Sequence, residues 1–159
     1  MRARGASPIV PRGRLPLNPG VARSRGAPLR ARSAAERLRE MAFARADDGA
    51  RIAYEASGEG VPLVWLHGFP FHRGLWAPQL AGLADVARGL APDLRGFGAS
   101  DLGRAAVTVD RYADDVAALL DALGIETAVV GGLSMGGYVA FAFARRHPGR
   151  LRGLVLADT

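Results

Sequence analysis

GGLSMGG, residues 131–137, places one serine, Ser134, between two pairs of glycines. The apolar run before it (127–132) predicts a buried strand, and the segment after it (135–147) predicts a helix that ends before Pro148. The stretch fits G-x-S-x-G, which is typical of a strained turn that lifts a serine above a sheet at a helix N-terminus. Glycines are required in such a turn, because side chains there would collide with the strand and the helix.

The same region has a second interpretation, because residues 127–144 contain no charged side chain over about eighteen positions, close to the length of a membrane span. Ser134 and the glycines interrupt the apolar pattern at its centre. This interruption favours a strand, a turn and a helix, and we expect no membrane span.

The rest of the chain continues the alternation of strands and helices. The sequence predicts strands at 51–56, 62–66, 86–93 and 151–158, a short helix at 74–83, a glycine-rich loop at 94–103 and a longer helix at 108–123. Thr108 is the expected N-cap of the longer helix and Gly124 its end. This order predicts an α/β fold with a mostly parallel sheet and helices on both faces. The acidic residues off the apolar stripe of the longer helix are interpreted as a solvated face: Asp110, Asp114, Asp115 and Asp121.

The chain divides by composition into two parts within its 159 residues. Residues 1–40 carry ten arginines and two glutamates and no apolar periodicity, and we expect a disordered extension. A targeting segment, an arm that binds nucleic acid or anionic lipid, and a start codon assigned upstream of Met41 are the alternatives. Residues 41–159 are mildly acidic and form the folded domain. Residues 1–40 contain no apolar run of the kind a secretory signal needs, so we expect no such signal and a cytoplasmic protein.

Several chemistries find no support in the sequence. The chain has no cysteine, which excludes disulfides and thiolate metal sites. Neither a phosphate-binding loop nor a carboxylate or histidine cluster with metal-ligand spacing is present, so we expect no cofactor and no metal.

Two further motifs follow predicted strands. LHGFP (66–70) is a His-Gly loop that can aim a backbone N–H at an oxyanion, and APDLRGFGASD (91–101) follows the next strand. With GGLSMGG they resemble, in the same order, three motifs of the α/β-hydrolase superfamily. The likeness runs from about Arg51 to Thr159 and is greatest for its esterase, enol-lactonase and cofactor-free haloperoxidase branch.

The resemblance implies a truncated α/β-hydrolase fold and a set of site residues. Ser134 is the expected nucleophile, and the amides of Phe69 and Met135 the expected oxyanion hole. The residues that support these motifs are His67, Gly68, Gly132 and Gly136. Phe71 and Trp76 are candidates for lining an acyl pocket. Both are equally candidates for the core, which we favour for Trp76.

A serine needs a base and an acid that orients the base. In the family both follow the serine, and we expect them beyond Thr159, so that this chain is the N-terminal portion. Of the histidines present, His67 is expected to organise its loop and His147 to compensate the helix C-terminus, while His72 is a weaker candidate base.

Two carboxylates end strands. Asp158 is a candidate acid, because some relatives place the acid there, and Asp93 is expected to fix the glycine-rich loop.

The sequence therefore predicts a serine hydrolase of an ester or related small acyl substrate. A non-catalytic fragment and a cofactor-free haloperoxidase-like enzyme are the alternatives. The strand 151–158 is expected to be an open apolar edge. Neither the substrate nor the oligomeric state follows from the sequence.

Overall fold

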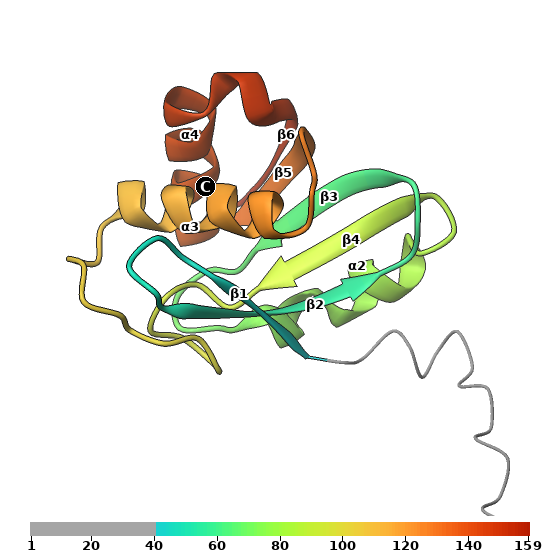
Figure 1. Ribbon diagram of the computed structural model, residues 1–159. Helices are drawn as coiled ribbons and strands as arrows, with labels where there is room; N and C mark the ends of the chain where they lie inside the picture. Colours follow the sequence, from blue (N-terminus) through green and yellow to red (C-terminus); the bar gives the residue numbers. More distant parts are fainter. Residues whose placement is uncertain (1–40) are drawn as a thin grey trace, which may run out of the picture. The chain divides into compact units, whose positions relative to one another are not determined.

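The computed structural model describes residues 41–159, which form one six-stranded sheet with helices packed on it (Figure 1). The strands are β1 (Ala42–Arg45), β2 (Arg51–Ser57), β3 (Val61–Leu66), β4 (Ala87–Pro92), β5 (Ala128–Leu133) and β6 (Leu151–Ala157). The helices are η1 (Arg73–Trp76), α2 (Ala77–Gly82), α3 (Val109–Ala122), α4 (Met135–Arg146) and η2 (Pro148–Arg150). The expectations for residues 1–40 lie outside the described residues.

The strand order is β1-β2-β4-β3-β5-β6. Strands β4, β3, β5 and β6 are parallel, whereas β1 pairs with β2 and β2 with β4 in antiparallel fashion. The mostly parallel sheet is therefore confirmed. Strand β1 was not predicted, because its four residues are too few to show an alternating pattern.

Helices cover both faces of the sheet, as predicted. Figure 1 shows α3 and α4 side by side on one face and α2 on the other. Along β3 the side chains alternate between these layers: Val64 and Leu66 belong to the core under α3 and α4, whereas Trp65 packs with Trp76 and Leu80 on the opposite face.

Helix α3 is close to its prediction. The Thr108 hydroxyl accepts a hydrogen bond from the Arg111 amide at 3.0 Å, and Gly124 has φ 63°, as an N-cap and a C-terminal stop require. The prediction of a solvated acidic face is wrong for Asp115, which is only 3% exposed because its carboxylate pairs with buried Arg95.

The predicted helix at 74–83 is two helices, since η1 is a 3-10 turn and α2 begins only at Ala77. Pro78 in the first turn of α2 has no amide hydrogen to donate and fits a helix start, so the break precedes it.

Strand β6 forms one edge of the sheet, and much of its apolar surface is exposed (Leu154, Val155 and Leu156, 38–44%). The expected apolar edge is thus present. Among residues 41–159, no helix combines the length and the apolar character needed to cross a membrane. The uncharged stretch 127–144 contains β5, the turn at Ser134 and most of α4.

Candidate active site

Ser134 lies in the tight turn between β5 and α4 and is exposed. Its φ of 50° lies in the left-handed region, which L residues rarely adopt. The Ser134 amide donates to Ala157 O of β6 at 3.0 Å, and its carbonyl accepts from the Gly137 amide at 2.8 Å and so begins α4. Within residues 41–159, the Ser134 side chain makes no capping hydrogen bond to α4.

The glycines of the turn are required by close backbone contacts. A Cβ on Gly132 would lie 2.2 Å from the carbonyl carbon of Gly136, and a Cβ on Gly136 would lie 2.2 Å from Leu66 O of β3. The prediction that side chains would collide here is confirmed. The absence of these side chains lets the first turn of α4 pack directly on the end of β3.

The loop after β3 lies against this turn. A Cβ on Gly68 would be 3.4 Å from the Ser134 Cβ and 3.1 Å from Leu133 O. The LHGFP and GGLSMGG motifs are thus neighbours in space, although about 65 residues separate them. The Phe69–Pro70 peptide bond of this loop is cis.

His67 is fully buried and joins two loops. The Leu94 amide donates to His67 Nε2 at 2.9 Å, and His67 Nδ1 lies 3.0 Å from Gly68 O. A backbone amide can only donate, so Nε2 is unprotonated and Nδ1 carries the hydrogen that bonds Gly68 O. Burial lowers the pKa of His67, which favours this neutral form. His67 therefore links its own loop to the loop that follows β4.

The two amides predicted to form an oxyanion hole belong to these neighbouring segments. Met135 is the first residue of α4, where amides have no partner within the helix. The Phe69 amide shares a peptide unit with Gly68 O, which also accepts from the Phe71 amide at 2.9 Å.

The two predicted pocket aromatics, Phe71 and Trp76, lie in different environments. Phe71 is exposed, as is its neighbour Phe69, whose ring packs edge-to-face with that of Phe97 at 6.0 Å between centroids. Trp76 is 7% exposed and stacks on Trp65 with 4.7 Å between ring centroids. Trp76 is thus a core residue, the alternative that the sequence favoured.

The other histidines have structural partners. His72 Nδ1 accepts from the Gly74 amide at 3.1 Å and caps η1. His147 Nε2 lies 2.9 Å from Asp114 Oδ1 of α3. His147 follows α4, whose 12 residues separate it from Ser134 by roughly 18 Å at 1.5 Å per residue.

The two carboxylates differ. Asp158 is exposed, has φ 47° and directly follows Ala157, the β6 residue that bonds the Ser134 amide. Asp93 is fully buried and accepts from the Ala99 amide at 2.7 Å, while its carbonyl accepts from the Ser100 hydroxyl at 2.7 Å. The expectation that Asp93 fixes the glycine-rich loop is confirmed.

A family model described as alpha/beta hydrolase fold matches residues 61–159, more than half of the chain. This chain belongs to the α/β hydrolase fold family. The resemblance drawn from the three motifs and the truncated α/β-hydrolase fold are therefore confirmed.

Relatives of this chain have names that describe different activities. Non-heme chloroperoxidase CPO-A1 of Kitasatospora aureofaciens is 38% identical over 111 residues, covering 69% of this chain and 40% of the relative. The 2-hydroxymuconate semialdehyde hydrolase of Pseudomonas sp. (strain CF600) is 41% identical over 112 residues, covering 68% and 40%. Among solved structures, a thermophilic esterase from Thermogutta terrifontis has 44% identity and a TM-score of 0.69, covering 74% of this chain and 45% of that one. The chain spans about 40% of the length of these curated relatives.

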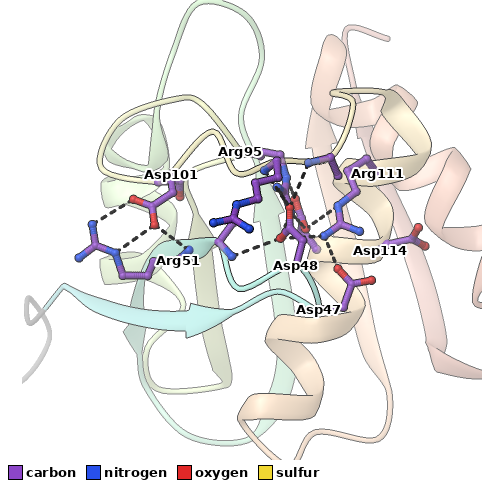
Figure 2. Close-up of polar contacts among 12 residues, drawn as sticks. Asp47, Asp48, Arg51, Arg95, Asp101, Arg111 and Asp114 are labelled. Carbon is purple, nitrogen blue, oxygen red and sulfur yellow. Dashed lines mark hydrogen bonds and ion pairs between the residues drawn. The ribbon is translucent and has the colours of Figure 1, made fainter.

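The domain also contains a buried ion-pair cluster that the sequence interpretation missed (Figure 2). Arg95, fully buried, bonds Asp115 through Nε (2.8 Å) and Nη2 (2.7 Å), and Asp48 through Nη1 (2.7 Å) and Nη2 (3.1 Å). Arg95 holds the pKa of Asp48 well below its ordinary value. One signal was available: Asp115 is three residues after Tyr112 and four before Leu119, on the buried side of α3.

Residues 41–159 hold no group of three or more histidine, cysteine or carboxylate side chains arranged to bind a metal ion.

Proposed function

We propose that the whole protein is a serine hydrolase of an ester or related small acyl substrate, with Ser134 as nucleophile. The observation that carries this proposal is the exposed Ser134, held at φ 50° between β5 and α4 and backed by Gly68 of the neighbouring loop. A serine in this turn projects its hydroxyl away from both elements, where a substrate can reach it.

The amides of Phe69 and Met135 are proposed to bind the oxyanion that forms when Ser134 Oγ attacks the acyl carbon. They lie on the two segments that meet at Ser134, and the Met135 amide has the N-terminus of α4 behind it. Loss of one such donor costs about 2.7–4 kcal/mol of transition-state stabilisation in characterised enzymes.

The base and the acid are proposed to come from sequence beyond Thr159 in the whole protein. His67, His72 and His147 are engaged in the structural contacts described above, and the chain spans only about 40% of its curated relatives. The base would take the Ser134 proton and return it to the leaving group. Asp158 remains a candidate for the acid, since it follows the strand that bonds the Ser134 amide.

A cofactor-free haloperoxidase-like activity is the second candidate. The observation that favours it is the 38% identity to a non-heme chloroperoxidase. The same serine, oxyanion amides and base would serve both candidates, so activity assays distinguish them. The third candidate is a non-catalytic role for the 159-residue chain alone.

Turnover of activated esters by the whole protein tests the proposal. Ser134→Ala and Ser134→Gly, of which glycine tolerates the positive φ, are expected to lower kcat by at least about 10³-fold. The matched control is Ser57→Ala, because Ser57 is the last residue of β2, donates its hydroxyl to Leu80 O of α2 and lies outside the proposed site. Retained turnover in both Ser134 variants would refute the nucleophile assignment. The 159-residue chain alone is expected to hydrolyse the same esters feebly or not at all.

A further inference from the structure

The loop from His67 to Arg73 is held at both ends by two consecutive residues after β4. At its start, the Leu94 amide donates to His67 Nε2 at 2.9 Å. At its end, the Arg73 amide donates to Asp93 Oδ1 at 2.7 Å, and the Arg73 guanidinium pairs with Asp93 Oδ2. His67 and Asp93 are fully buried, which limits the competition of water for these bonds.

These bonds constrain the direction of the Phe69 amide. His67 Nδ1–H and the Phe71 amide both donate to Gly68 O. The Gly68 carbonyl and the Phe69 N–H belong to one planar peptide unit, in which the two groups point in opposite directions when the bond is trans. Holding the carbonyl oxygen therefore holds the amide hydrogen.

Arg95 ties this arrangement to the rest of the domain. It directly follows Leu94, and its guanidinium joins Asp48 of the β1–β2 turn to Asp115 of α3 (Figure 2). Nη1 also donates to Leu102 O at 3.2 Å. A planar guanidinium serves two carboxylates at once, which a lysine ammonium cannot do with the same geometry.

We propose that Arg95 is a positioning residue for the Phe69 amide, acting through Leu94, His67 and the Gly68 carbonyl. The inference rests on the oxyanion role proposed above for that amide. The ion pairs to Asp48 and Asp115 fix residues 93–95, and these in turn fix loop 67–73 against Ser134.

Arg95→Lys is the test variant and Arg111→Lys its matched control. Arg111 contacts the same two carboxylates, at 3.2 Å from Asp48 and 3.4 Å from Asp115, but it lies on α3, remote in sequence from Leu94. Asp48→Asn is a milder second variant, since Asp48 is partly exposed and its loss leaves the Asp115 pair intact.

Amide hydrogen exchange in the 159-residue chain measures the protection of the loop amides directly. Arg95→Lys and Asp48→Asn are expected to accelerate exchange at Leu94 and Phe71 by about tenfold, the loss of roughly one hydrogen bond's worth of protection. Arg111→Lys is expected to change it by less than about twofold. Unchanged exchange in the Arg95 and Asp48 variants, or equal acceleration in Arg111→Lys, would overturn the proposal.

Steady-state kinetics of the whole protein read the consequence. The Phe69 amide is proposed to stabilise the transition state and not the bound substrate. If Arg95→Lys misdirects this amide, it is expected to lower kcat about tenfold and to leave KM within about twofold. Faster loop exchange with unchanged kcat would refute positioning of the Phe69 amide. If the wild-type protein shows no Ser134-dependent turnover, the proposed function fails, and hydrogen exchange alone then decides whether Arg95 holds the loop.

Discussion

Ser134 adopts φ 50°, a conformation that costs a non-glycine residue roughly 1–3 kcal/mol and persists only where its surroundings enforce it. Those surroundings are its hydrogen bonds to Ala157 and Gly137 and the close backbone contacts at Gly132 and Gly136. The strained turn was predictable from the sequence, because glycine spacing records where side chains do not fit. The burial of the Arg95 charge could not be predicted, because no pattern in a single sequence indicates that Arg95 contacts Asp48.

Gly132→Ala is expected to lower the free energy of unfolding by about 2 kcal/mol or more, since its Cβ would overlap the backbone of α4. Gly82→Ala is the control, because no atom lies within 4 Å of a Cβ there, and it is expected to change stability by less than about 1 kcal/mol. Urea unfolding of the two variants measures the difference, and similar losses would contradict the steric account.

The pH dependence of stability should carry the signature of His67. Burial lowers its pKa below the ordinary 6.5, so the unfolded chain binds the proton more readily than the folded one. Its stabilising contribution is complete above pH 6.5 and is lost as pH falls toward the folded-state pKa. Urea unfolding between about pH 5 and pH 8 measures this contribution. As pH falls, the free energy of unfolding should decline less steeply in His67→Gln than in His72→Gln, a control at an exposed site. Equal slopes in both variants would contradict the buried neutral imidazole.

Among the elements, those with strong periodicity or a clear stop matched their predictions. Helix α3 begins directly after its N-cap Thr108 and ends before Gly124 because local capping groups decide both ends. Strand β1 and the break between η1 and α2 depend on pairing and packing with distant segments, which local patterns do not contain. The role of Asp115 likewise depends on Arg95, twenty residues earlier.

Strand β6 is expected to drive self-association of the 159-residue chain, because it is an edge strand with exposed apolar side chains. Val155→Lys should reduce aggregation, measured by light scattering at matched concentration. Val86→Lys is the control, because Val86 is more exposed than Val155 (67% against 41%) but lies in a turn and not on the edge strand. This variant should have little effect on aggregation. If both variants reduced aggregation equally, the cause would be a general gain in solubility and not a change at the edge strand.

At the scale of the whole molecule, the motifs predicted the fold, and two of them lie next to each other in the structure. GGLSMGG and LHGFP lie at the carboxyl ends of adjacent parallel strands, β5 and β3, so the turns that follow these strands meet. The proton-transfer groups were not found among residues 41–159, where the histidines serve loops and helix ends. The proposed activity therefore belongs to the whole protein.

Covalent labelling of the whole protein by a serine-directed phosphonate, followed by peptide mapping, tests the central claim most directly. We expect a single label on the peptide that contains Ser134 in the wild-type protein and no label on the Ser134→Ala variant. Equal labelling of the Ser134→Ala variant, or a label that maps to Ser57 or Ser100, would contradict it.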